Sequence, residues 1–334
     1  MSLGFLNAGR VRSITGSRDS LTIVSLFISL LVLCLFFGSQ TPFFFTQANL
    51  ETLTRTIAVV GITSIGMTLV LISGGVDISV GSVAALAGVV TSQLWLNSGI
   101  PLGVSAVIGV LSGGLVGLFN GIIVSYFRIN PLITTLATFS IVRGLAFVLS
   151  EGQTNLLSNE AFNFLGRGTI AGIPFSLIIM LLLYAIFALV LRYTAFGRNL
   201  YAIGGSAEAS RLAGISVTPH LLIVFIISGL LAAFSGIISV SQLASSAPRA
   251  ATGLEFTVIT AVVLGGTSLA GGKGTLIGTL IGVIILRVLD NGLVLMSVSS
   301  FYQEVARGVV LILAVSFDQV RIRIAQLQQR RRKA

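Results

Sequence analysis

The stretch GGVDISVGS, residues 74–82, separates two long apolar runs and places one carboxylate, Asp77, among glycines and hydroxyl groups. A charged side chain at membrane depth is costly, so it needs a partner or a function there. Gly74, Gly75 and Gly81 let the backbone leave a helix, and a bilayer tolerates such a break only against protein or a water-filled cavity. The stretch therefore indicates a broken helix beside a translocation path.

The composition is that of a membrane protein. Of the 334 residues, 54% are hydrophobic and 9% are charged, whereas a soluble domain is about 25% charged. The mean hydropathy is +1.03. The net charge of +10 does not indicate nucleic acid, because the basic residues stand at the ends of apolar runs. Cys34 is the only cysteine, so no disulfide can form within the chain.

Apolar runs of about 20 residues, the length that spans a bilayer, recur along the chain. All six prolines fall between these runs or at their first residues, where a missing amide hydrogen is harmless. We therefore expect an all-α polytopic membrane protein with about ten spans. The ten expected runs are 21–38, 51–73, 79–97, 102–126, 131–150, 174–191, 220–241, 254–270, 274–294 and 302–317.

The distribution of Lys and Arg predicts the orientation, because cytoplasmic connections are enriched in both. When the connections between the runs are assigned alternately to the two sides of the membrane, one side receives 14 of the 20 basic residues. This distribution predicts that both termini are cytoplasmic. The expected organisation is a cytoplasmic segment at 1–20, a transmembrane domain at 21–318 and a basic cytoplasmic tail at 319–334. Within the domain, 151–173 is the external loop and 192–219 is the cytoplasmic loop.

Glycines repeat at four-residue spacing in two runs, at Gly109, Gly113, Gly117 and Gly121 and again at Gly274, Gly278 and Gly282. Residues four apart share a helix face, so each series predicts a groove for close helix packing. A surface on which helices slide during transport is the alternative.

A second glycine cluster, GGTSLAGGKG, contains Gly265, Gly266, Gly271 and Gly272. It fails the phosphate-loop pattern, since Gly274 follows Lys273 where a Ser or Thr is needed. We expect no catalytic residue, no metal site and no nucleotide site in this chain. Its likeness to the first stretch suggests an internal duplication.

The cytoplasmic loop predicts a short helix. Ser206 can cap a helix from Ala207 to Ala213, Gly214 can end it, and Glu208 can pair with Arg211. A solvated connector is one interpretation of this helix, and a docking element is the other.

Four strings together resemble the permease subunits of bacterial ABC importers of the ribose and simple-sugar class, in the branched-chain amino acid/ribose permease superfamily. They are MTLVLISGGVDISVGS (67–82), FGRNLYAIGGSAEASRLAGI (196–215), ISGLLAAFSGII (227–238) and AVVLGGTSLAGGKGTLIGTLIG (261–282). The resemblance runs from about residue 45 to 317. Glu208, Ala209 and Gly214 keep the spacing by which importer permeases engage their ATPases, with Ser210 in place of an alanine.

The resemblance implies a multi-pass protein of the bacterial inner membrane that forms a homo- or heterodimer. Its other partners would be a cytoplasmic ATPase, which binds ATP and magnesium, and a periplasmic sugar-binding protein. The expected ATPase-coupling residues are Ala207, Glu208, Ala209, Arg211, Leu212 and Gly214.

Other polar residues in the runs carry open interpretations. Asp77, with Ser79, Ser82 and Asn120, could line or gate the path, or Asp77 could cap the following helix, which we favour. The mid-run Arg143 needs a carboxylate, carbonyl or water partner. Arg287 with Asp290, and Glu304 with Arg307, have the spacing of local helix pairs. Gln242 can bind sugar hydroxyls or another helix, and His220 suits an interfacial position.

Two other functions remain open at this point. An ion-coupled secondary transporter could also use broken helices and a buried Asp77, but it would not need the short cytoplasmic helix. A membrane scaffold or receptor would have no evident use for glycine breaks in its interior. We therefore expect an ATP-driven importer permease for a monosaccharide or a related small polyol.

Overall fold

The computed structural model describes the backbone of residues 7–331 and the side chains of residues 23–316. The side chains of the predicted segment 1–20 and tail 319–334 therefore lie outside the described residues. The helices are α1 (Asn7–Gln40), α2 (Gln47–Ile72), α3 (Val80–Ser98), α4 (Leu102–Ser125), α5 (Pro131–Ser150), α6 (Glu160–Arg167), α7 (Phe175–Tyr193), α8 (Ala195–Gly205), α9 (Ala207–Leu212), α10 (Val217–Leu243), α11 (Leu254–Leu264), α12 (Leu276–Leu295) and α13 (Ser300–Arg331). Four two-residue strands complete the elements: β1 (Asn155–Leu156), β2 (Thr169–Ile170), β3 (Ile173–Pro174) and β4 (Ser245–Ser246).

The predicted all-α membrane architecture is confirmed. Among the described residues, eight helices are long and apolar enough to cross a bilayer: α1 to α5, α7, α10 and α12. The run expected at 254–270 is helical only as far as Leu264, where Gly265 and Gly266 begin a turn. At 1.5 Å per residue this helix covers about half of the bilayer core. The count of ten and the orientation of the termini stay predictions.

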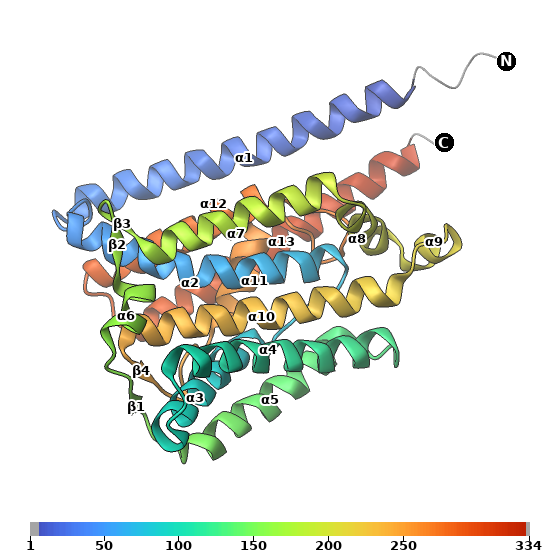
Figure 1. Ribbon diagram of the computed structural model, residues 1–334. Helices are drawn as coiled ribbons and strands as arrows, with labels where there is room; N and C mark the ends of the chain where they lie inside the picture. The colour runs from blue at the N-terminus through green and yellow to red at the C-terminus, as the bar shows by residue number, and fades with distance from the viewer. Residues whose placement is uncertain (1–6, 332–334) are drawn as a thin grey trace.

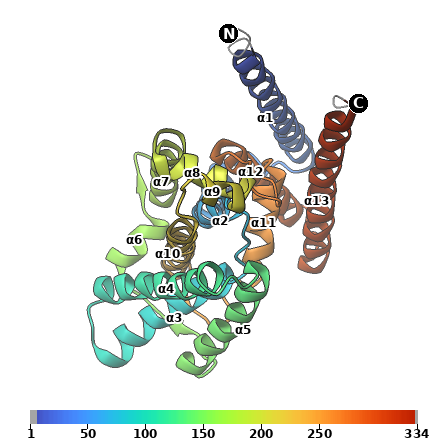
Figure 2. The same cartoon turned by 90° about the vertical axis from the view of Figure 1, so that its right-hand side faces the viewer.

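The centre of the bundle is α2. Its side chains are buried along most of its length, and Ile62, Ile65, Met67 and Leu69 are fully enclosed. The layer of α3, α4 and α5 lies on one side of α2 and α10, and α12 and α11 lie on the other (Figure 2). In the same view α1 and α13 project away from the other helices. The exposed apolar side chains of α1, α4, α5 and α7 suit contact with lipid.

The first glycine series marks close helix packing, as predicted, and so do Gly278 and Gly282 of the second, whereas Gly274 lies in the turn before α12. A Cβ at Gly117 would overlap the carbonyl oxygen of Phe225 in α10, and one at Gly229 of α10 would overlap that of Gly113. In α12, a Cβ at Gly282 would overlap the carbonyl oxygen of Ala261 in α11. The backbones therefore approach as closely as small residues at membrane helix interfaces allow.

Two polar clusters link helices that are distant in sequence. The side-chain amides of Asn49 in α2 and Asn291 in α12 bond reciprocally, at 3.0 and 2.7 Å. Asp290 accepts from Arg287 Nη1 and from Arg307 Nε, both at 3.0 Å, and so ties α12 to α13. The pairing of Arg287 with Asp290 is confirmed. That of Arg307 with Glu304 is wrong, because Arg307 turns towards the buried Asp290 while Glu304 is exposed.

The bundle has two distinct ends (Figure 1). At one end lie α6 and the short strands, with β1 paired to β4 and β2 to β3. The predicted external loop 151–173 belongs to this end and packs on the last turns of α10, where Gly166 N donates to Ser241 Oγ at 2.7 Å. The opposite end carries α8 and α9, together with the start of α1 and the end of α13.

Candidate functional site

The first glycine stretch holds Asp77 in a closed hydrogen-bond network. Gly74 adopts a φ of +87°, which turns the chain out of α2. Asp77 is 1% exposed. Its Oδ1 accepts from the Ser79 amide at 3.0 Å and the Ser79 hydroxyl at 2.6 Å, and its Oδ2 accepts from the Ser228 hydroxyl of α10 at 2.8 Å. Asp77 thus fixes the backbone that enters α3 and joins it to α10.

The same network continues into α4 and α5. Asn120 Nδ2 donates to Ser79 Oγ at 3.1 Å, and Thr138 Oγ1 donates to Asn120 Oδ1 at 2.7 Å. Ser82 bonds the carbonyl of Ser79 at 2.8 Å. All these side chains are buried. The four residues proposed from sequence as a path or gate therefore lie together and join helices, and their role in a path stays a prediction.

The two glycine stretches meet at the end of α2. The amide of Gly272 donates to the carbonyl of Ile72 at 2.9 Å. A Cβ at Gly271, whose φ is +83°, would lie 2.9 Å from Gly74 Cα. Three other glycines expected at breaks lie in close packing. A Cβ at Gly265 would overlap Gly278 of α12, one at Gly81 would overlap the Glu255 carboxylate, and one at Gly75 would lie 3.2 Å from a Val70 methyl. Gly266 has a φ of +92°.

The short helix predicted in the cytoplasmic loop is present as α9. Ser206 Oγ accepts from the amide of Ala209 at 3.2 Å, so the cap is confirmed. Gly214 follows the helix with a φ of +82°, which confirms the predicted stop. Arg211 and Glu208 pair at 2.6 Å.

The outer surface of α9 is exposed and partly apolar. Leu212 is 82% exposed. We call Ala207, Glu208, Ala209, Arg211 and Leu212, all exposed, the α9 surface. Ser210 is 4% exposed, so the departure from the family pattern lies on the inner face.

The segment before α9 contacts both glycine stretches. A Cβ at Gly204, near the end of α8, would overlap the carbonyl of Ile72 and lie 2.5 Å from the amide of Gly272. Tyr201 donates from its hydroxyl to the carbonyl of Gly274 at 2.8 Å. His220 stacks on Phe196 with ring centroids 5.5 Å apart, which holds α8 against α10. The segment before α9 therefore lies against the backbone at the end of α2 and at the second glycine stretch.

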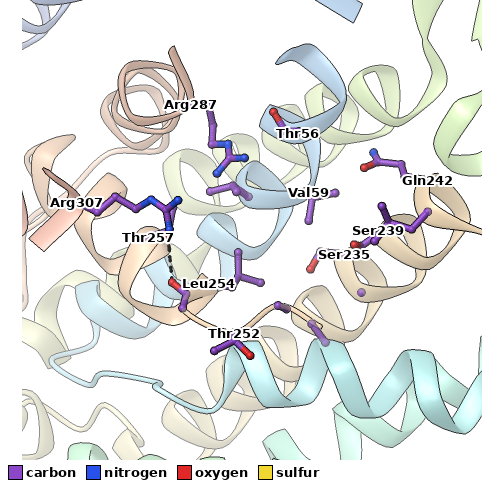
Figure 3. Close-up of a pocket in the computed structure, with 16 residues that line it drawn as sticks. Thr56, Val59, Ser235, Ser239, Gln242, Thr252, Leu254, Thr257, Arg287 and Arg307 are labelled. Atoms are coloured by element: carbon purple, nitrogen blue, oxygen red, sulfur yellow. Dashed lines mark hydrogen bonds between the residues drawn. The ribbon is translucent and has the colours of Figure 1, made fainter. Parts of the chain in front are cut away.

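A cavity of about 290 Å³ opens in the half of the bundle away from α9 (Figure 3). It lies near the start of α2, the end of α10 and the start of α11. Its remaining walls come from α3, α12, α13 and the turn before α11. Arg287 and Arg307 approach from one side and Ser239 and Gln242 from the other. The lining residues are Thr56, Val59, Val60, Ala84, Ser235, Gly236, Ser239, Gln242, Leu243, Ala251, Thr252, Gly253, Leu254, Thr257, Arg287 and Arg307.

One wall of the cavity is held in place by Arg143. Its Nη1 donates to the carbonyls of Pro248 and Ala250, at 2.7 and 2.8 Å, in the turn that supplies Ala251 and Thr252. The carbonyl partner expected for this arginine is confirmed. Gln242 is tied to α2, since its Nε2 donates to the Arg55 carbonyl at 3.1 Å.

Sequence analysis named Gln242 but missed Ser235, Ser239 and Arg307 as members of a common site. A signal was present, because Ser228, Ser235, Ser239 and Gln242 recur at seven, four and three residues. That spacing places all four on one face of a helix.

Broken helices, a polar cavity in one half and an exposed helix at the other end define a multi-pass membrane transport protein. The chain belongs to the family described as branched-chain amino acid transport system / permease component, whose model matches residues 49–315. It is thus a permease component and a multi-pass protein of the inner membrane.

Three relatives illustrate the similarity. The L-arabinose ABC transporter permease protein AraH of Azospirillum brasilense is 41% identical over 292 residues, 87% of this chain and 86% of its own. The ribose import permease protein RbsC of Bacillus subtilis is 40% identical over 88% of this chain and 91% of its own. RbsC of Escherichia coli K12 is 41% identical over 87% of this chain and 92% of its own. No solved structure matches the chain.

Proposed function

We propose that this chain is the permease subunit of an ATP-driven importer and forms the path for a monosaccharide or a related small polyol. The relatives named for L-arabinose and ribose support this cargo class. A periplasmic binding protein would deliver the cargo, and a partner ATPase would supply the energy and bind ATP and magnesium. The permease itself would hydrolyse no nucleotide.

The observation that carries the proposal is the α9 surface and its connection to the core. An exposed leucine beside a charged pair suits a groove in a partner protein. ATP-driven closure of the partner would push on α9. The contact of Gly204 with Ile72 and Gly272 would pass that movement to the ends of both glycine stretches.

A second permease subunit would complete the path. Exposed apolar side chains along α5 and α13 leave room for such a neighbour as well as for lipid. Cargo selection would rest mainly with the binding protein, because a permease that held its cargo tightly would release it slowly.

Reconstitution tests the proposal. The permease is purified in mild detergent with its co-purifying ATPase and binding protein, then placed in vesicles with labelled pentose. We expect uptake that requires ATP and survives an uncoupler. Uptake by the permease alone, abolished by the uncoupler, would instead identify an ion-coupled carrier.

A further inference from the structure

We propose that the cavity between α2, α3, α10, α11, α12 and α13 is a binding site for the cargo and that it selects neutral polyhydroxy solutes. This inference rests on the proposed function, because it names the site at which that cargo first contacts the chain. The position supports it: Thr56 lies near the start of α2 and Gln242 near the end of α10, both remote from α9. A solute that arrives from the side opposite the partner ATPase would meet this site first.

The lining offers unused hydrogen-bond donors and acceptors together. Arg307 uses Nε for Asp290, and its two terminal nitrogens have no partner among the described residues. The Ser239 hydroxyl is likewise free of protein partners there and is half-buried between buried neighbours. Gln242 commits its nitrogen to Arg55 and leaves Oε1 available. A sugar hydroxyl both donates and accepts, so it can use all three groups.

The charge of the lining disfavours cations. Arg287 and Arg307 share one carboxylate, Asp290, which leaves one positive charge in excess beside the cavity. In a partly enclosed site that charge repels an ammonium group but still donates to neutral hydroxyl oxygens.

The same lining predicts weak binding. None of its residues is aromatic, so a sugar ring finds no face on which to stack. The apolar part is limited to small and aliphatic side chains such as Val59, Ala84 and Leu254. Weak, hydroxyl-directed binding suits a site that must release its occupant at each cycle.

The single native cysteine allows a direct test on the permease alone. In a Cys34→Ser background, Ser239→Cys is labelled with a hydrophilic maleimide in detergent, with and without D-ribose or L-arabinose at high concentration. Because ligand binding lowers the fraction of free sites by the factor 1 + [pentose]/Kd, we expect the pentose to slow labelling about three- to tenfold at roughly two to nine times its Kd. The matched control is Ser158→Cys, an exposed serine of the external loop outside the cavity, where no slowing is expected. Equal rates with and without pentose at Ser239→Cys would overturn the proposal.

A second comparison tests the selection against cations. D-glucose should slow labelling of Ser239→Cys more than D-glucosamine, which carries an ammonium group. Adding Arg307→Gln should reduce this difference, because it removes the excess charge. Labelling at Ser158→Cys and the elution volume report whether that variant is folded. Equal protection by the two hexoses would refute the selection for neutral solutes.

The outcomes separate this site from the proposed function. Protection of Ser239→Cys from labelling needs no ATPase. Protection without ATP-dependent uptake would therefore contradict the proposed importer function but support the proposed cargo site. ATP-dependent uptake by the complete complex, without protection of Ser239→Cys from labelling, would support the importer function and rule out the proposed cargo site.

Discussion

The amide of Gly272 donates to the carbonyl oxygen of Ile72, and this 2.9 Å bond joins the two glycine stretches of the permease. Ile72 is the last residue of α2, so the bond satisfies a carbonyl that the helix leaves unpaired. Gly204, two residues before the cap of α9, lies against both partners. The end of the central helix, the second break and the α9 segment therefore share one junction.

Substituting Gly204 should disturb this junction. In Gly204→Ala the new methyl overlaps the Ile72 carbonyl, and we expect about 1–3 kcal/mol lower stability, typical of overpacking, together with loss of most ATP-dependent uptake. Gly205→Ala is the matched control, since a Cβ there meets nothing within 4 Å. Melting in detergent and uptake in vesicles measure both variants. Normal uptake by Gly204→Ala would show that the junction transmits nothing.

The α9 surface should hold the ATPase through Leu212. Burying a leucine contributes about 1.5–3 kcal/mol, so Leu212→Asp should weaken retention of the ATPase roughly tenfold or more. Ser210→Ala, on the buried inner face, should leave retention unchanged. Co-purification on an immobilised permease measures this. If Leu212→Asp retains the ATPase as well as the unmodified permease does, the ATPase docks at another surface.

Asp77 should act as a structural acceptor. Asp77→Asn keeps an oxygen for Ser79 and can offer its amide to the Ser228 hydroxyl, so we expect near-normal uptake and stability. Asp77→Ala leaves two buried hydroxyls and an amide without their acceptor, and each unsatisfied group costs about 1–3 kcal/mol. A lower melting temperature of Asp77→Ala checks this. Complete loss of uptake in a stable Asp77→Asn protein would instead indicate a gate that depends on charge.

Arg143 should stabilise the turn that walls the cavity. Arg143→Met removes two charge-assisted bonds, each worth about 1.5–3 kcal/mol, and should expose the turn at 247–253 to protease. The control Arg249→Met removes only an exposed cation–π contact with Phe147, worth about 0.5–1 kcal/mol. Limited proteolysis of both variants makes the comparison. Identical cleavage would show that Arg143 does not hold the turn.

Local sequence signals predicted much of this architecture. Apolar runs, prolines and glycines placed α2 to α5, α7, α10 and α12 to within a few residues, whereas α1 begins well before its expected run and α13 ends well after its own. The Ser206 cap followed from neighbouring residues alone. Such features depend on contacts between residues close in the chain, which sequence spacing reveals.

Long-range pairing could not be predicted in the same way. Glu304 stands at helical spacing from Arg307, yet Asp290 of another helix is the partner. The cavity is lined by residues from six helices and a turn, so no single segment shows it. The reach of α11 depends on where Gly265 packs against α12, which the apolar run does not record.

The reciprocal amides of Asn49 and Asn291 fix α2 and α12 in one register. A slide of one residue, about 1.5 Å, would break both bonds. We therefore expect that any movement of α2 along the bundle axis carries α12 with it.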